Sequence, residues 1–250
     1  MTLYLYPYIG GSASVRELKT RRGDDLCVLR RERSRFRGGP NKLVVNWGAN
    51  RCPAEVLRCR VVNSPVNVSR ASNKLEAFRA MASEEHPITV EYTDSREVAL
   101  RWIADGHTVV ARTLLSAHEG RGIVLVTRAE ELPPGCRLFT KYKKKAREFR
   151  VHVFNGYTLV NEKLKRRGAE HHMIRNTANG YVFGRNPEHV PASVSQVARL
   201  ACERLGLTFG AVDVIYNQRE NRSYVLEVNT APGIETSVAD WYVERIKELV

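Results

Sequence analysis

The chain has 250 residues and a formal net charge of +13, with 43% hydrophobic and 27% charged residues. This composition is typical of a soluble globular protein with one large domain or two to three small ones. The sequence contains no apolar run near the ~20 residues of a membrane span, and its first residues lack the basic segment of a signal peptide. Its five scattered cysteines argue against a disulfide framework or a zinc site, so we expect a reducing, cytoplasmic location.

The positive charge favours an anionic partner, such as nucleotide phosphates, nucleic acid, or an acidic peptide or protein. Basic residues cluster at positions 16–37, 141–150 and 163–167. The segment 30–37 is compatible with a nucleic-acid patch and equally with a solvated loop. No nucleic-acid-binding motif supports the first interpretation.

The first 68 residues alternate between strand and helix patterns. We predict one short helix at 13–20 and strands at 3–8, 26–30 and 43–47. Residues 61–65 predict a further short strand that ends in a turn. This alternation is typical of a small α/β domain with a parallel sheet.

The pattern changes from about residue 69. Ser72 is the predicted N-cap of a helix, a second helix is predicted at 95–105, and strands at 88–92, 107–113 and 123–127. Gly120 and Gly122 suit a loop whose backbone N–H groups close over phosphate, although a tight hairpin is the alternative. The Pro-Pro-Gly sequence within residues 132–136 indicates a hinge between subdomains.

The remaining chain predicts strands at 137–142, 148–154 and 157–163, and a helix at 191–205. An Asn-Gly pair at 155–156 indicates a tight hairpin. Alternation in the second strand places Glu148, Arg150 and His152 on the face opposite the core.

The segments 206–216 and 223–229 alternate as two half-buried strands joined by a turn. Asp213, Glu227 and Asn229 then share one face. Pairing Asn217 with Ser223 sets Asp213 opposite Glu227, with Cβ atoms about 4.5–5.5 Å apart. The side chains expected in one core on the other face are Val212, Val214, Tyr216, Tyr224, Leu226 and Val228.

Two carboxylates this close repel each other unless a cation lies between them. Mg²⁺ prefers such oxygen ligands and usually also binds phosphate oxygens of a substrate. We therefore predict a metal–nucleotide site on this hairpin. The alternative is an exposed face with ordinary surface acids.

Four segments together resemble the ATP-grasp fold of carboxylate–amine ligases, in particular RimK-type glutamate ligases and LysX-type ligases. They are the segments at 148–156, 174–180, 210–214 and 226–233. The resemblance implies an α+β fold in which two α+β subdomains clasp ATP, preceded by a small pre-grasp α/β domain. The implied boundaries are 1–68, 69–136 with the phosphate lid, and 137–250 with the metal site.

The resemblance also implies residue roles. Asp213, Glu227 and Asn229 would hold Mg²⁺, for which Mn²⁺ can substitute. Arg150 would steady the γ-phosphate and the acyl phosphate, and Lys163 or Arg166 would orient the carboxylate, unless 163–167 is a solvated turn. The nucleotide-binding residues would be Lys74, Arg112, Gly120, Gly122, Phe139, Thr140, Lys141, Tyr142, Glu148 and Asn176.

Two positions depart from the family pattern. Arg112 stands where a lysine usually contacts the α- and β-phosphates, and Lys141 where the hinge usually presents an acid. Arginine binds phosphate well but with a different, planar geometry. ATP binding stays plausible at both positions, and its strength is left open.

The implied reaction is ADP-forming: ATP phosphorylates a carboxylate, and an amine attacks the resulting acyl phosphate to form an amide. The basic charge favours an acidic peptide or protein as a substrate, and a small diacid stays open. One alternative is a non-catalytic basic module that binds nucleic acid or an acidic protein, although the intact acidic trio argues against it. Another is a phosphotransferase on the same fold.

Overall fold

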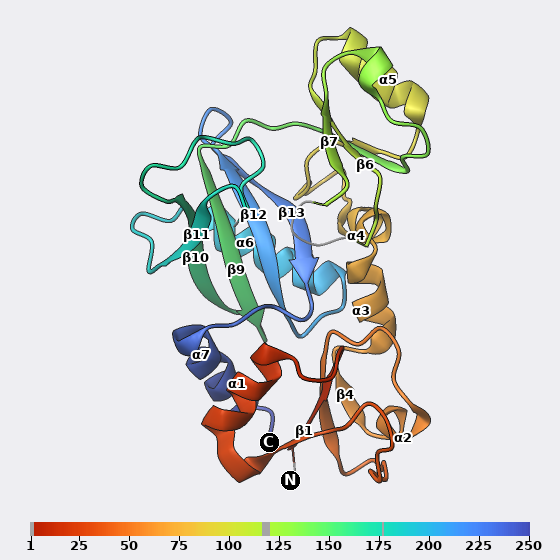
Figure 1. Ribbon diagram of the computed structural model, residues 1–250, viewed down its shortest axis with the longest axis vertical. Helices are drawn as coiled ribbons and strands as arrows, with labels where there is room; N and C mark the ends of the chain where they lie inside the picture. Colours follow the sequence, from red (N-terminus) through yellow and green to blue (C-terminus); the bar gives the residue numbers. More distant parts are fainter. Residues whose placement is uncertain (1–2, 117–120, 177) are drawn as a thin grey trace.

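The computed structural model describes residues 3–116, 121–176 and 178–250. A parallel sheet lies at one end of the elongated molecule, a five-stranded sheet in the middle and a smaller sheet at the other end (Figure 1). No helix within these ranges combines the length and apolar character needed to cross a membrane. The predicted α+β fold with an α/β N-terminal part is confirmed. The boundaries after residues 68 and 136 stay predictions.

The N-terminal sheet is parallel, with strand order β2-β1-β3-β4. The predicted parallel sheet is therefore confirmed. β3 is buried along its whole length, which its apolar sequence allows. The elements are β1 (Leu3–Pro7), α1 (Ala13–Arg22), η1 (Gly23–Asp25), β2 (Leu26–Val28), β3 (Leu43–Trp47), α2 (Ala54–Leu57) and β4 (Arg60–Val62).

Helix α7 (Thr236–Lys247), far away in sequence, packs beside α1 at this end of the molecule (Figure 1). Its Tyr242 is fully buried, with its ring centroid 5.2 Å from that of Trp47 and 6.1 Å from that of Phe209. The sequence analysis missed α7. Its apolar residues recur at helical spacing, so the periodicity was available as a signal.

Two helices, α3 (Pro65–Ser72) and α4 (Lys74–Met81), connect this lobe to the rest of the chain. The predicted short strand within 61–65 ends at Val62 and the expected turn follows it, with Pro65 already the first residue of α3. Asn63 takes a positive φ of 61°, and the Ser64 hydroxyl caps α3 by accepting from the Asn67 N–H at 3.2 Å. Proline suits the first helical position because its missing N–H is not needed there.

The N-cap of α4 is Asn73, and the predicted Ser72 cap is wrong. Asn73 Oδ1 accepts from the N–H groups of Leu75 and Glu76 at 3.1 and 3.3 Å. Ser72 instead ends α3, and its hydroxyl donates to the Val68 carbonyl at 2.8 Å. The prediction failed because α3 itself was not recognised.

This cap gives a testable difference between two neighbours. Asn73→Ala is expected to lower the free energy of unfolding by about 1 kcal/mol, because it leaves two helix N–H groups without their acceptor. Ser72→Ala is expected to cost less, since that hydroxyl bonds a carbonyl already in the helical ladder. Urea denaturation of both variants measures the difference, and equal losses would contradict the assignment.

The central sheet is antiparallel, with strand order β11-β10-β9-β12-β13. Asn155 and Gly156 both have positive φ, as the predicted tight turn between β9 and β10 requires. The short edge strand β11 was not predicted. The elements are β9 (Arg147–Phe154), β10 (Tyr157–Lys165), β11 (Tyr181–Arg185), α6 (Ala192–Arg204), β12 (Phe209–Asn217) and β13 (Arg222–Asn229).

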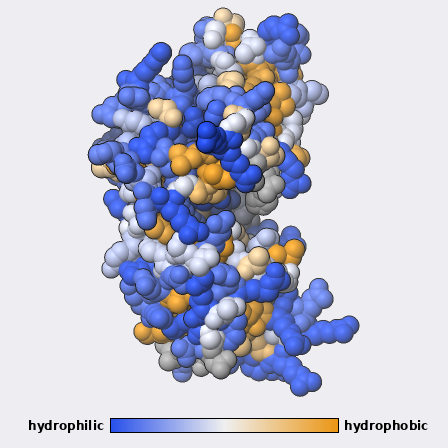
Figure 2. Space-filling model, turned by 60° about the vertical axis from the view of Figure 1, so that its left-hand side comes forward, coloured by the Kyte–Doolittle hydropathy of each residue, from blue (hydrophilic) through white to orange (hydrophobic). Residues whose placement is uncertain are grey.

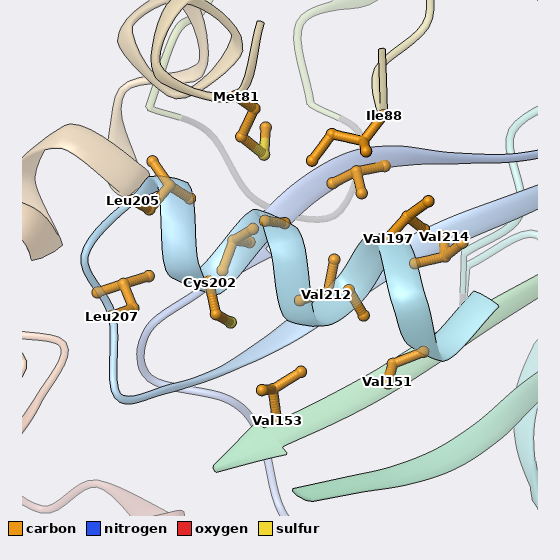
Figure 3. Close-up of a cluster of buried hydrophobic side chains, with 14 of the residues drawn as sticks. Met81, Ile88, Val151, Val153, Val197, Cys202, Leu205, Leu207, Val212 and Val214 are labelled. Atoms are coloured by element: carbon orange, nitrogen blue, oxygen red, sulfur yellow. The ribbon is translucent and has the colours of Figure 1, made fainter. Parts of the chain in front are cut away.

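Helix α6 covers one face of this sheet, where valines from β9 and β12 meet its apolar side (Figure 3). Met81 at the end of α4 and Ile88, which lies beside β13, complete the cluster (Figure 3). This core fixes which side chains of β9 and β12 point to the opposite face. The labelled residues from the two strands and α6 are Val151, Val153, Val197, Cys202, Val212 and Val214.

Asp213 lies opposite Glu227, as predicted, but the register differs from the prediction. Ser223 pairs with Tyr216, not with Asn217. A β-bulge next to Asp213 then restores the Asp213–Glu227 pairing by adding one residue to β13.

The bulge also changes which side chains share a face. Leu226 and Glu227 both line the site, whereas Val225 and Val228 lie in the core under α6. Tyr224 packs in a separate cluster with Leu226. The prediction of one core for Tyr224, Leu226 and Val228 is therefore wrong.

The third sheet is antiparallel, with strand order β5-β8-β6-β7, and α5 packs on it. The predicted strand at 88–92 is largely wrong, since this segment links two sheets. Thr89 makes only an isolated bridge to Val225, and the Val225 N–H donates to the Ile88 carbonyl at 2.7 Å. The elements are β5 (Tyr92–Thr93), α5 (Arg96–Ala104), β6 (Val109–Arg112), β7 (Ile123–Val126), η2 (Ala129–Glu131) and β8 (Leu138–Lys141).

Candidate functional site

A cavity of about 460 Å³ opens between the third sheet and the face of the central sheet opposite α6. Residues of both sheets and of the segment 173–176 line it. Most of the predicted site residues therefore lie in one place. Those that line the cavity are Arg112, Thr140, Lys141, Tyr142, Glu148, Arg150, Lys163, Asn176, Asp213, Glu227 and Asn229.

Four predicted residues of the described chain do not line this cavity. Lys74 forms an ion pair with Glu227, which does line it, and Phe139 is fully buried in the core under α5. Gly122 lies at the start of β7, where its carbonyl accepts from the Thr113 N–H at 2.9 Å. Arg166 is exposed after β10. Gly120 lies outside the described residues.

Arg150 and Asp213 form a two-pronged ion pair across β9 and β12. Arg150 Nε and Nη2 donate to the two Asp213 oxygens at 2.8 and 2.9 Å. Burial opposes the charge of Asp213, but the guanidinium outweighs it and holds the pKa of this carboxyl below its usual range. Burial likewise opposes the charge of Arg150, and Asp213 outweighs it, so the pKa of Arg150 is raised. Both groups are therefore charged at neutral pH.

Glu148 forms ion pairs with two lysines that also line the cavity. Its carboxylate oxygens lie 2.5 Å from Lys163 Nζ and 2.5 Å from Lys145 Nζ. Burial lowers the pKa of Lys145, and Glu148 partly offsets that effect. Arg150 and Lys163 also lie over the Phe183 ring, at 4.5 and 5.6 Å from its centroid. Cations outnumber carboxylates here, which suits an anionic ligand.

Glu227 and Asn229 lie at the end of β13. Lys74 Nζ is 3.2 Å from Glu227 Oε2, and Asn229 Nδ2 donates to Glu227 Oε1 at 3.2 Å. Each carboxylate of the predicted metal site is thus paired with a cation, Asp213 with Arg150 and Glu227 with Lys74.

The donor set fits Mg²⁺. Asp213 and Glu227 face each other across two strands, and Asn229 adds an amide group beside them. Hard oxygen ligands of this kind suit Mg²⁺ or Mn²⁺. Within the described residues no three His, Cys, Asp or Glu side chains gather into a ligand cluster, so substrate oxygens would complete the coordination.

Arg112 is 7% exposed and its Nε has no hydrogen-bond partner among the described residues. Burial lowers the pKa of this guanidinium, and the charge of Glu227 opposes that effect. A buried donor without an acceptor is costly. Arg112 thus contributes a buried cation to the cavity wall, close enough to Glu227 for the two charges to interact.

The sequence analysis missed two cations of the cavity, Arg175 and Lys145. Arg175 Nε is buried without a hydrogen-bond partner in the described chain, and its guanidinium lies 5.7 Å from the Tyr181 ring centroid. Its position directly before Asn176 was a usable signal. Lys145 is one of several basic residues at 141–150, and nothing in the local sequence distinguishes it from the others.

An apolar wall was also missed. It consists of aliphatic side chains from both sheets, a surface suited to a flat aromatic group. These are Val90, Val110, Ile123, Leu125, Ile215 and Leu226.

His152 lies on the face that carries Glu148 and Arg150, as expected, but α7 covers it there and it does not line the cavity. Its Nδ1 lies 3.2 Å from the Tyr242 hydroxyl of α7. Burial, with the charge of Arg150, lowers its pKa to about 3. The imidazole is therefore neutral at physiological pH.

No protein-family profile and no curated protein sequence matches the chain. Solved structures match over nearly its full length. The ATP-grasp ligase PsnB, complexed with a minimal precursor, Mg and ADP, is 12% identical over 98% of this chain and 97% of its own, with a TM-score of 0.71.

Two further matches come from named organisms. The macrocyclase MdnC from Microcystis aeruginosa MRC, bound with the precursor peptide MdnA, is 13% identical over 99% of this chain and 100% of its own, with a TM-score of 0.66. D-alanine–D-alanine ligase from Bacillus anthracis is 14% identical over 99% and 97%, with a TM-score of 0.66. At these identities the likeness concerns architecture, and this chain has the ATP-grasp fold.

Proposed function

We propose that the chain is an ATP-dependent ligase that joins a carboxylate to an amine through an acyl phosphate. The observation that carries this proposal is the single cavity that gathers an apolar wall, a set of cations and the Asp213–Glu227–Asn229 trio. Such a cavity fits a nucleoside triphosphate, which has an aromatic end and a polyanionic end.

The two ends of the cavity differ in chemistry. Adenine would lie against the aliphatic wall beside strand β8, where Thr140 and Lys141 line the cavity. The phosphates would extend toward Arg112 and the carboxylates of the central sheet. Asp213, Glu227 and Asn229 would hold Mg²⁺, which when bound neutralises phosphate charge during phosphoryl transfer.

Cationic side chains of the protein would assist the two steps of the reaction. A substrate carboxylate oxygen attacks the γ-phosphorus, and the bond to the β–γ bridging oxygen breaks to release ADP. An amine nitrogen then attacks the acyl carbon, phosphate leaves, and the amine loses a proton. Arg150 would stabilise the charge on the transferred group, and Lys163 would orient the carboxylate.

A peptide is the favoured substrate class. PsnB and MdnC, which match this chain over nearly its full length, were solved with precursor peptides. The net charge of +13 favours an acidic peptide over a neutral one.

Calorimetric titration with a non-hydrolysable ATP analogue tests the nucleotide site without knowledge of the substrates. We expect binding that weakens at least about tenfold without Mg²⁺, since uncompensated phosphate charge would face Asp213 and Glu227. A folded sample that binds no analogue would contradict the proposal and favour the non-catalytic basic module. ADP release that needs the acid but no amine would indicate a phosphotransferase instead.

A further inference from the structure

The positive charge is concentrated in the N-terminal lobe. Its first 68 residues hold thirteen Lys and Arg against five Asp and Glu, which is +8 of the net +13 in about a quarter of the chain. Hydrophilic side chains cover much of this lobe, the lower one in Figure 2. The site proposed above does not use these charges, since the cavity lining begins at Val90.

The densest part is the loop at residues 30–37, between β2 and β3. Arg30, Arg33 and Arg35 are exposed, and none of them forms an ion pair or hydrogen bond within the described residues. The loop is nevertheless anchored. Phe36 packs on Tyr4, with ring centroids 4.8 Å apart, and Arg31 Nη1 donates to the carbonyls of the β1 end. Anchored cations without internal partners form a preorganised cationic surface that can receive an anionic chain.

Contacts connect this loop to a second cavity, which is lined in part by the predicted metal-binding residues of β13. Arg31 Nη1 bonds the Tyr8 carbonyl at 2.6 Å. Tyr8, which is 47% exposed, lines a second cavity of about 130 Å³ together with Lys74, Glu227 and Asn229. An extended chain held at the loop could therefore reach the far side of the strand that carries the metal ligands.

We propose that the loop at residues 30–37 is a docking site for an acidic segment of the peptide that the ligase modifies. This inference rests on the function proposed above. Charge complementarity selects the acidic peptide, and the contact through Tyr8 places it near the reaction. Single-stranded nucleic acid is less well suited, because it needs aromatic platforms and the loop's one ring, Phe36, is packed against the sheet.

The test compares Arg33→Gln/Arg35→Gln with a matched control, Arg101→Gln/Arg199→Gln. Both pairs remove two charges from exposed positions, and the control positions lie on α5 and α6. The probe is a short fluorescent peptide of alternating glutamate and glycine, followed by anisotropy. A glutamine version and an oligothymidylate of equal length serve as comparison probes.

We expect the loop variant to bind the glutamate peptide about fivefold more weakly than the unmodified protein, and the control to change less than about twofold. Binding should weaken with added salt. Equal losses in both variants, or no binding of the glutamate peptide by the unmodified protein, would overturn the proposal. Tighter binding of the oligothymidylate that is lost in the loop variant would assign the loop to nucleic acid and overturn it too.

ATP-analogue binding is measured on the same three proteins. Unchanged analogue binding with weakened peptide binding separates docking from the nucleotide site. If none of the three proteins binds the ATP analogue, the proposed ligase function is contradicted. The peptide-binding data still decide whether the loop binds acidic chains.

Discussion

Glu227→Ala is expected to reduce ATP-dependent turnover by at least about a thousandfold while the protein stays folded. Glu227 supplies a carboxylate of the predicted metal site and lies opposite Asp213. Its side chain is 28% exposed toward the cavity, so its loss leaves no hole in the core. Initial rates of ADP release and thermal unfolding measure the two effects separately.

A matched control is Glu162→Ala. Glu162 also lies in the central sheet and pairs with a cation, Arg147, at 2.6 Å, but it does not line the cavity. This variant should keep most of its turnover. Unfolding of Glu227→Ala, or equal losses of turnover in the two variants, would show that Glu227 has a structural role.

Arg150→Ala is expected to lower turnover by about two to three orders of magnitude, with a much smaller loss of ATP-analogue affinity. The reason is that we place its guanidinium on the charge that develops in the transition state. Single-turnover rates and calorimetry give the two quantities. Equal losses of rate and affinity would remove the transition-state role.

The same variant should also be less stable by about 3 kcal/mol at neutral pH, because it leaves Asp213 buried without its partner. Burial then raises the pKa of Asp213, which Arg150 now holds down. The destabilisation is present where the carboxylate is ionised and shrinks as pH falls through the raised pKa. Arg150→Ala/Asp213→Asn should regain part of the stability at neutral pH, and urea denaturation across pH checks both expectations.

Local signals explain what could be predicted. The Asn155-Gly156 turn and the alternation around Asp213 depend on neighbours in the sequence, so both appear as expected. The β-bulge in β13 leaves no local trace, because residues 223–229 alternate regularly. It became visible only in the pairing with β12.

Non-local contacts explain what the sequence left out of the site. Arg150 and Asp213 were expected separately as a phosphate-binding and a metal-binding residue. Their mutual ion pair joins residues 63 positions apart and depends on the order of strands in the sheet. Lys145 was missed for a different reason: its partner Glu148 is only three residues away, but the burial that sets this pair apart depends on the fold.

The packing of α7 against the N-terminal sheet has a consequence for how the protein is made. Leu5, Leu18 and Trp47 share a core with Tyr242 and Ile246. During synthesis, the early segments of that core leave the ribosome long before α7 does. Until then their apolar face has no cover and is exposed to chaperones and proteases, so folding of the first lobe is coupled to completion of the central sheet and α7.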